Sequence, residues 1–183
     1  MIGHAAERFT VRILTAQEAR ERAADLAEVL VDCVEGGASV NFMAPLTREK
    51  AAGFWRRVAE GVAAGDRLLL VAEDGASGEI VGTVQLVLGL PENQPHRADV
   101  AKMLVRRSAR RQGLGASLMC AVEEAARAAG RTLLVLDTVT GSDAERLYER
   151  LGWMRVGVVP DYALWPDGRL CDTTIFYKAL TGG

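Results

Sequence analysis

Cysteine and histidine are scarce in this chain of 183 residues, and their scarcity excludes several kinds of site. The three cysteines, Cys33, Cys120 and Cys171, lie far apart and show no Cys-x-x-Cys spacing. We therefore expect no disulfide framework, no zinc site and no other metal. The two histidines are His4 and His96, and no Gly-x-Ser-x-Gly motif is present, which argues against a hydrolase with a Ser-His-Asp triad.

Long apolar runs and an excess of charge of either sign are also missing. The longest apolar runs, such as Leu68–Ala72, have the length of a strand, and the first residues do not resemble a signal peptide. Lysine and arginine together number 22 and aspartate and glutamate 24, for a formal net charge of −2. The sequence thus predicts a cytoplasmic protein that binds neither nucleic acid nor membrane, and in which any anion site is local.

Hydrophobic periodicity predicts one mixed α/β domain over residues 1–183. Strands are expected at residues 9–14, 67–73, 79–90, 99–105, 131–138, 154–159 and 173–178. Helices are expected from Thr15 to Gly36–Gly37, from Thr47 to Gly65, from Gly113 to Ala129 and from Ser142 to Gly152, with residues 160–169 as a loop.

The segment from Asp99 to Thr138 is predicted to be a strand, a helix and a second strand. Such a unit implies two parallel strands joined by a right-handed crossover, whereas the rest of the sheet is expected to be antiparallel. The second strand is almost continuously apolar, which indicates burial on both of its faces. In the helix between them, Glu123, Glu124 and Arg127 lie off the apolar stripe and are expected to point into solvent.

The turn between the first of these strands and the helix carries the strongest functional signal. It reads Arg110-Arg111-Gln112-Gly113-Leu114-Gly115. A helix N-terminus presents unpaired N–H groups, glycine lets a phosphate approach the backbone, and arginine adds charge-assisted contacts, so a pyrophosphate is the expected ligand. The spacing is neither that of a Rossmann turn, because position 118 is Leu, nor that of a P-loop, because no Lys follows the second glycine.

These residues match the [RQ]-x-x-G-x-[GA] signature of the GCN5-related N-acetyltransferases (GNAT), which the chain resembles. The flanking strand, helix and strand, and the segment AERLYERLGWMRVG at 144–157, resemble the same family. The resemblance follows the order of elements from Phe9 to Leu180 and is specific from about Asp99 to Gly157. Residues 96–115, 133–153 and 158–169 look like the branch that contains the tabtoxin resistance protein.

The resemblance implies a single-domain GNAT fold. Its sheet is mixed and mostly antiparallel, a central parallel pair of strands is splayed around acetyl-CoA, and helices cover both faces. The implied activity is that of an acyltransferase, an N-acetyltransferase that uses acetyl-CoA as cosubstrate and passes the acetyl group directly to the primary amine of a small molecule. The branch likeness points to resistance against a toxin or antibiotic, and the family implies a monomer or a homodimer.

Two other functions stay open at this point. An acetyltransferase acting on a protein N-terminus or a lysine would need a groove open at both ends, which the loops Asn41–Pro45 and Pro160–Arg169 would either flank or cap. A non-catalytic acyl-CoA-binding module would hold the cosubstrate without turnover.

The resemblance also assigns cofactor-binding residues. The backbone of Met103, Leu104 and Val105 would bind the pantetheine arm. The pyrophosphate would be held by the turn and the first helical turn, namely Arg110, Arg111, Gln112, Gly113, Leu114, Gly115, Ala116 and Ser117. Arg106 and Arg107 would either reach the ribose 3′-phosphate or lie in solvent. Many family members carry Asn where this chain has Gly141, so a contact made by that side chain is absent or replaced.

Three residues are expected to carry catalysis. Tyr148 matches the family tyrosine that protonates the departing thiolate, although its helical spacing to Ala144 and Leu151 would equally suit an interior aromatic. Asp99 and Asp137 would face the acceptor amine and one of them would supply the base, although Asp99 would also suit a solvated strand edge and Asp137 a turn or the flank of a helix. His96 would be an alternative base or a solvent-facing loop residue.

Overall fold

The computed structural model describes residues 8–180, which fold around one seven-stranded sheet. The strands are β1 (Phe9–Leu14), β2 (Arg67–Asp74), β3 (Ile80–Val87), β4 (Arg97–Val105), β5 (Leu133–Val139), β6 (Met154–Leu164) and β7 (Leu170–Ala179). The helices are α2 (Ala16–Glu21), α3 (Ala23–Glu35), α4 (Arg48–Ala63), α5 (Leu114–Ala128) and α6 (Asp143–Arg150), with a short 3₁₀ turn at Arg107–Ala109.

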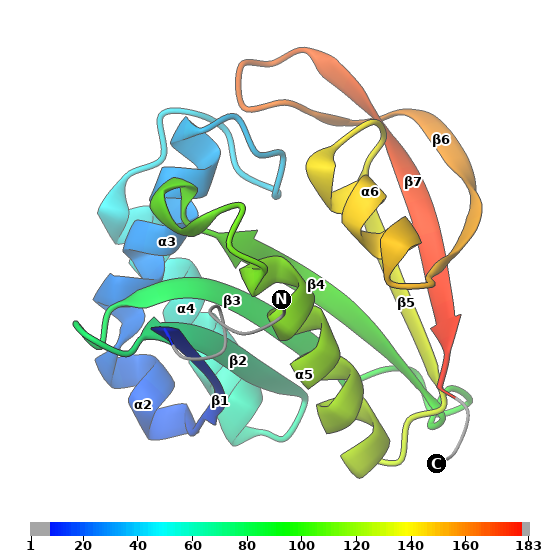
Figure 1. Ribbon diagram of the computed structural model, residues 1–183, viewed down its shortest axis with the longest axis horizontal. Helices are drawn as coiled ribbons and strands as arrows, with labels where there is room; N and C mark the ends of the chain where they lie inside the picture. The colour runs from blue at the N-terminus through cyan, green and yellow to red at the C-terminus, as the bar shows by residue number, and fades with distance from the viewer. Residues whose placement is uncertain (1–7, 181–183) are drawn as a thin grey trace.

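The sheet has the strand order β1-β2-β3-β4-β5-β7-β6, and β4 and β5 form its parallel pair. These two strands pair over three positions, from Arg97 opposite Leu133 to Asp99 opposite Val135. Beyond this point they diverge, which opens the sheet into two halves (Figure 1). The predicted fold class, a mostly antiparallel sheet with a splayed parallel pair, is confirmed.

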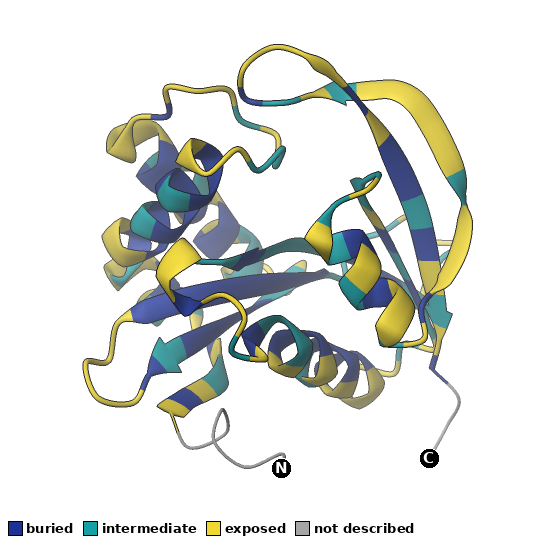
Figure 2. Cartoon of the chain, turned by 45° about the horizontal axis from the view of Figure 1, so that its top comes forward, coloured by how far each residue is buried: buried dark blue, intermediate teal, exposed yellow. Residues whose placement is uncertain are grey.

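Helices cover both faces of the sheet, each over its own apolar core (Figure 2). On one face α5 packs Leu118 and Val122 against β2, β3 and β4. On the other face α3 and α4 pack around Leu30 and Trp55, which are fully buried. Leu118 and Val122, which belong to the apolar stripe of α5, are thus buried, as helical periodicity predicts.

Two predicted elements have different bounds in the structure. The helix expected from Thr15 to Gly36–Gly37 is interrupted at Arg22, whose backbone leaves the helical region with φ −93° and ψ 12°. The guanidinium of Arg22 binds Glu73 at 2.7 Å and the carbonyl oxygen of Gly78 at 2.9 Å. The break therefore lies where α2 and α3 are tied to the β2–β3 hairpin.

Residues 160–169 were expected to be a loop, but β6 continues to Leu164 and β7 begins at Leu170. Proline removes a donor from a strand, which is tolerated at a sheet edge or at a bulge. Pro160 meets both conditions, because β6 is an edge strand of the sheet and its register with β7 shifts between Val159 and Ala163. The residues that looked like a loop thus extend a long hairpin.

Two burial predictions were wrong. Glu123 was expected in solvent, but its residue is 7% exposed, and its carboxylate binds Trp153 and Lys178. The strand 131–138 was expected to be buried on both faces, but in β5 burial alternates, with Leu136 buried and Asp137 exposed. From Leu136 onward β5 has parted from β4 and borders an open cleft, so Asp137 is exposed there.

Within residues 8–180, none of the helices combines the length and the apolar character that a membrane crossing requires. The same part of the chain holds no group of three His, Cys, Asp or Glu side chains arranged to bind a metal ion.

Candidate active site

A cleft of about 890 Å³ lies where β4 and β5 diverge. Its walls come from segments far apart in the chain: the loop after α3, the second half of β4, the start of α5, the end of β5, α6 and the β6–β7 hairpin. The splayed strands expose backbone that a regular sheet would pair, so the cleft combines apolar walls with free polar groups.

The wall formed by β4 contains a β-bulge. Thr83 of β3 lies opposite Leu104 and Gln85 lies opposite Ala101, so the single residue between them faces both Lys102 and Met103. Lys102 takes up the bulge with a positive φ of 52°, and the hydroxyl of Thr83 donates to its carbonyl oxygen at 2.9 Å. A bulge bends its strand and redirects side chains, and here it turns β4 away from β5.

The three β4 residues predicted to hold the pantetheine arm, Met103, Leu104 and Val105, all line the cleft. Their edge of β4 lies beyond Asp99, where pairing with β5 has ended. The carbonyl oxygen of Val105 already accepts hydrogen bonds from Arg110 Nε at 3.0 Å and from Cys33 Sγ at 3.5 Å. The strand therefore offers its remaining free backbone groups to an extended ligand laid beside it.

The turn before α5 has the geometry of an anion site. Gly113 is the N-cap of α5 with φ 79°, a left-handed conformation that glycine adopts without strain. Within the described chain, the backbone N–H groups of residues 111–116 donate to no protein acceptor. These N–H groups and the positive end of the dipole of a 15-residue helix meet at the cleft.

Most of the predicted pyrophosphate residues line the cleft, namely Arg110, Arg111, Gly113, Leu114, Gly115 and Ala116. Two others do not. The side chain of Gln112 accepts a hydrogen bond from Arg8 at 3.1 Å, and the hydroxyl of Ser117 donates to the carbonyl oxygen of Gly113 at 3.3 Å. These two side chains support the turn from outside.

The two arginines ahead of the turn, Arg106 and Arg107, lie outside the cleft lining and bind carboxylates elsewhere. Arg106 pairs with Glu79, and Arg107 pairs with Asp32 at 3.0 Å. Two arginines that the sequence reasoning missed, Arg146 and Arg150, do line the cleft. Their spacing of four residues on the helix that carries Tyr148 was the signal that could have revealed them.

Tyr148 is both an interior aromatic and a cleft residue. It is 5% exposed, and its ring lies 6.0 Å from that of Trp153 and 6.1 Å from that of Phe176, measured between centroids. Burial, assisted by the negative charge of Asp137, raises the pKa of the Tyr148 phenol above its ordinary value. The side chain therefore remains a protonated donor at neutral pH.

The structure separates the two aspartates that the sequence reasoning paired. Asp137 lines the cleft from β5. Asp99 does not, because it lies at the point where β4 and β5 still pair, and its carboxylate binds Arg97. The cleft thus holds Asp137 and Tyr148 but not Asp99.

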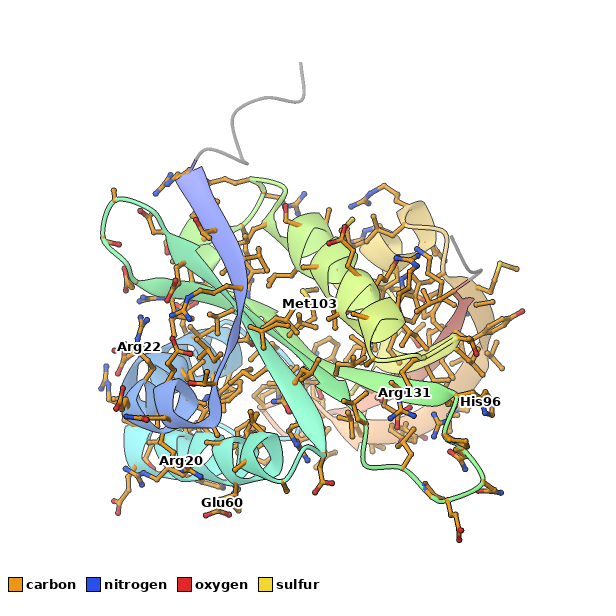
Figure 3. All side chains as sticks on the ribbon, turned by 90° about the horizontal axis from the view of Figure 1, so that it is seen from below. Arg20, Arg22, Glu60, His96, Met103 and Arg131 are labelled. Atoms are coloured by element: carbon orange, nitrogen blue, oxygen red, sulfur yellow. The ribbon has the colours of Figure 1, made fainter. Side chains whose placement is uncertain are left out.

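His96 is also distant from this chemistry. It precedes β4 and lies with Arg131 at the edge of the molecule, whereas Met103 lies near its centre (Figure 3). The carbonyl oxygen of His96 accepts a hydrogen bond from the backbone N–H of Thr132 at 2.8 Å, so the residue holds the start of β5. The other histidine, His4, lies outside the described residues.

Lys102 is a cleft residue that the sequence reasoning missed. Its side chain projects from the bulge toward α4, with Nζ 5.9 Å from the centroid of the Phe54 ring. Desolvation lowers the pKa of its ammonium group, while Asp137 opposes this shift. A single lysine within an otherwise apolar strand, VAKMLV, was the available signal.

One end of the cleft is covered by two loops that contact each other. The hydroxyl of Ser39 donates to the carbonyl oxygen of Leu164 at 2.6 Å. The backbone N–H of Ala44 donates to the carbonyl oxygen of Pro166 at 3.1 Å. The loop after α3 and the β6–β7 hairpin, which both line the cleft, are therefore joined to each other.

Residues 65–155, which include the bulge, the turn, α5 and the parallel pair, match the family model described as the acetyltransferase (GNAT) domain. The chain therefore contains a segment that matches a GNAT acetyltransferase domain. This match agrees with the predicted family and enzyme class, but it does not reach the level of the branch within the family.

Relatives of this GNAT domain show how far the similarity extends. A protein of Azospirillum brasilense, described as an uncharacterized N-acetyltransferase in the hisH-hisA intergenic region, is 36% identical over 115 residues. That match covers 62% of this chain and 66% of the relative, so the chain spans slightly less than two thirds of the relative's length.

Solved structures are similar over nearly the whole chain. The N-acetyltransferase from Staphylococcus aureus Mu50 has a TM-score of 0.77 at 16% identity, covering 94% of this chain and 99% of that one. The acetyltransferase yncA from Salmonella typhimurium, whose structure contains its cofactor acetyl-CoA, has a TM-score of 0.76 at 18% identity, covering 96% and 95%. At these identities the likeness establishes the fold and leaves the acceptor open.

Gly141 occupies the position at which the family resemblance implies Asn in many members. The backbone N–H of Gly141 donates to the carboxylate of Glu145, and its carbonyl oxygen accepts from Arg146 at 3.0 Å. The backbone at this position is therefore satisfied within α6 and its cap, and no side chain extends from it into the cleft.

Proposed function

We propose that this GNAT domain transfers the acetyl group of acetyl-CoA directly to the primary amine of a small molecule, and that the domain extends over residues 1–183. One observation carries the proposal. Arg111 and residues 113–116, whose backbone N–H groups are free, line the same cleft as Asp137 and Tyr148. A phosphate binder and two proton-transfer groups thus share one space.

The residues present fit acetyl-CoA. A volume of about 890 Å³ lies within the range of ligand clefts, roughly 300–1,000 Å³. The turn is packed closely, since a Cβ atom added to Gly115 would lie 3.0 Å from Leu147 Cδ2. The turn residues 110–116 would hold the pyrophosphate and the backbone of residues 103–105 the pantetheine arm. The cosubstrate supplies an acetyl thioester, which an amine attacks at its carbonyl carbon.

The two titratable cleft residues divide the proton transfers between them. Asp137 attracts the ammonium form of the acceptor and takes its proton, directly or through a water molecule. As the new carbon–nitrogen bond forms and the carbon–sulfur bond breaks, Tyr148 gives its phenol proton to the departing sulfur. With a raised pKa, the phenol is fully protonated at neutral pH.

Direct transfer, without an acyl-enzyme, is supported by the state of Cys33. This cysteine lines the cleft, but it is buried and its thiol donates to the carbonyl oxygen of Val105. Desolvation raises its pKa, so it is a thiol and not a thiolate nucleophile. The amine itself is therefore the group that attacks.

A small acceptor is supported by the cap over the cleft. The contacts of Ser39 with Leu164 and of Ala44 with Pro166 close the end at which a peptide groove would have to continue. The finer proposal, detoxification of an amino-acid-like or β-lactam toxin in the cytoplasm, is supported by the resemblance of residues 96–115, 133–153 and 158–169 to the tabtoxin resistance branch.

The test is thiol release from acetyl-CoA with a panel of amines: amino-acid toxins, polyamines, aminoglycosides and short peptides. We expect turnover with a small amine and a loss of about 100-fold or more in Asp137→Asn and Tyr148→Phe. Turnover confined to peptides would favour a protein acetyltransferase. Binding of acetyl-CoA with no turnover on any amine would favour a binding module.

A further inference from the structure

The ammonium group of Lys102 is a charge in the cleft without a protein partner. Within residues 8–180 its Nζ has no carboxylate oxygen within 4.0 Å and donates no hydrogen bond. Nζ lies 5.9 Å from the centroid of the Phe54 ring, which is at the outer limit of a cation–π interaction. Lys102 is half-buried, and a charged group that is partly removed from water is stabilised when a ligand supplies the opposite charge.

The surroundings of Lys102 reinforce its positive charge. Arg67 of β2 lies close enough to repel it and forms no ion pair within the described chain. Arg67 instead donates to Gln85 Oε1 at 2.9 Å, while the buried Arg67 Nε and Gln85 Nε2 find no hydrogen-bond partner there. Two cationic side chains therefore lie near each other on β2 and β4, and neither is paired with a carboxylate within the described chain.

The opposite charge lies across the cleft. Asp137 belongs to β5 and Lys102 to β4, and both lie beyond the last paired positions, Asp99 and Val135. The two groups influence each other electrostatically without forming an ion pair. A ligand placed between them meets a carboxylate on one side and an ammonium group on the other.

We infer that the acceptor is an amine that also bears an acidic group, as in an amino acid, and that Lys102 binds this acidic group while Asp137 faces the amine. The inference rests on the proposed function and narrows its substrate class. Each charge of a zwitterionic acceptor then finds its counterpart, and the unpaired ammonium of Lys102 gains a charge-assisted hydrogen bond. Lys102 is thus the specificity-determining residue of the acceptor site.

A different role for Lys102 is proton acceptance from the amine. The two roles predict different behaviour, because a proton acceptor serves every acceptor alike. A residue that binds an acidic group matters only for acceptors that carry one. Matched pairs of acceptors therefore separate the roles.

The experiment compares amino acids with their carboxamides, which keep the amine and lose the negative charge. The kcat/KM of each pair is measured with wild type, Lys102→Met, Lys102→Arg and the control Lys50→Met, a substitution on the exposed face of α4. We expect wild type to prefer the carboxylate-bearing member. In Lys102→Met this preference falls about 10-fold to 100-fold, as for the loss of one hydrogen bond to a charged group. Lys102→Arg should keep most of the preference for the carboxylate-bearing acceptor, and Lys50→Met should keep all of it.

Calorimetry of the same pairs in the presence of coenzyme A tests Lys102 independently of turnover, and the same preference is expected in the binding constants. Equal binding and turnover of both members by wild type would overturn the inference and leave the acetyltransferase proposal standing. An equal loss of kcat/KM for the amino acid and for its carboxamide in Lys102→Met would likewise overturn the inference. Acceptor binding that follows the charge without any turnover would uphold the role of Lys102 and sink the proposed function.

Discussion

Trp153 donates a hydrogen bond from its indole nitrogen to Glu123 Oε1 over 3.1 Å, and both residues are buried. The same carboxylate binds Lys178 Nζ at 2.8 and 2.9 Å. The network ties α5 to β7 and to the residue that follows α6. Because Trp153 packs against Tyr148, it also fixes the position of the proposed proton donor.

Glu123→Ala is expected to lower the free energy of unfolding by about 3 kcal/mol, because the substitution leaves the largely buried ammonium of Lys178 without its carboxylate. Urea denaturation measures the effect, and Glu124→Ala, on the exposed side of the same helix, is the matched control. Adding Lys178→Met to Glu123→Ala should recover part of the loss. Equal stability of the two single variants would contradict a stabilising network.

Gly113→Ala is expected to weaken acetyl-CoA binding at least tenfold, because it strains the turn whose N–H groups form the proposed anion site. Gly130→Ala provides the comparison, since Gly113 and Gly130 have φ values of 79° and 71° at opposite ends of α5. Both variants should lose roughly 1–2 kcal/mol of stability. Fluorescence or calorimetric titration should show weaker binding in the first alone, and equal affinities would remove the turn from the site.

Tyr148→Phe is expected to lower kcat by about 100-fold or more while leaving the KM for acetyl-CoA nearly unchanged, because the phenol acts on the leaving group. A second effect concerns stability. In the folded protein the pKa of Tyr148 is raised above the ordinary 10.0. The stability that the buried, protonated phenol contributes is therefore complete below pH 10.0, and it is lost as the pH rises through the pKa of the folded state. Wild type should therefore lose stability above pH 10 more steeply than Tyr148→Phe, and parallel curves would mean that the phenol is not buried.

Asp137→Asn and Asp99→Asn are expected to differ sharply. The first removes the carboxylate of the cleft and should reduce kcat/KM by about 100-fold or more. The second breaks only the contact with Arg97, outside the cleft, and should retain activity within about threefold of wild type. Steady-state kinetics of the two variants measures the difference in kcat/KM. A larger loss in Asp99→Asn than in Asp137→Asn would place the base on β4.

Lys102→Met is expected to stabilise the unliganded protein, because it removes a partly buried charge that has no protein partner. The pKa of Lys102 is lowered on folding, so its penalty is fully present below the folded pKa and fades as the pH rises toward the ordinary 10.5. Denaturation midpoints at pH 7 and pH 10 should show a gain over wild type that shrinks at the higher pH. A loss of stability at pH 7 would show that the ammonium is satisfied by the protein.

Much of the fold was predictable because its signals are local. Thr15 caps α2 and Thr47 caps α4 through hydrogen bonds to residues three positions along the chain. Gly113 and Gly130 bracket α5 because each adopts a positive φ. The position of the proposed phosphate-binding turn follows from the same local rules, since a glycine-rich helix start after a strand presents free N–H groups wherever it occurs.

The side-chain surroundings were not predictable in this way. Asp99 and Asp137 look alike in the sequence, but pairing between β4 and β5 ends at Asp99, so only Asp137 reaches the cleft. Glu123 looked solvent-facing because helical periodicity cannot reveal a lysine 55 residues away in β7. The cap of the cleft joins Ser39 and Leu164 across 125 residues.

The sequence by itself determined most of the elements, the proposed anion-binding turn and the presence of Tyr148 on α6, because hydrogen bonds and dihedral preferences within a few residues produce them. Only the tertiary structure decided which charges share the cleft. That outcome depends on where two strands stop pairing and on a bulge at Lys102, and both arise from contacts between segments far apart in the chain.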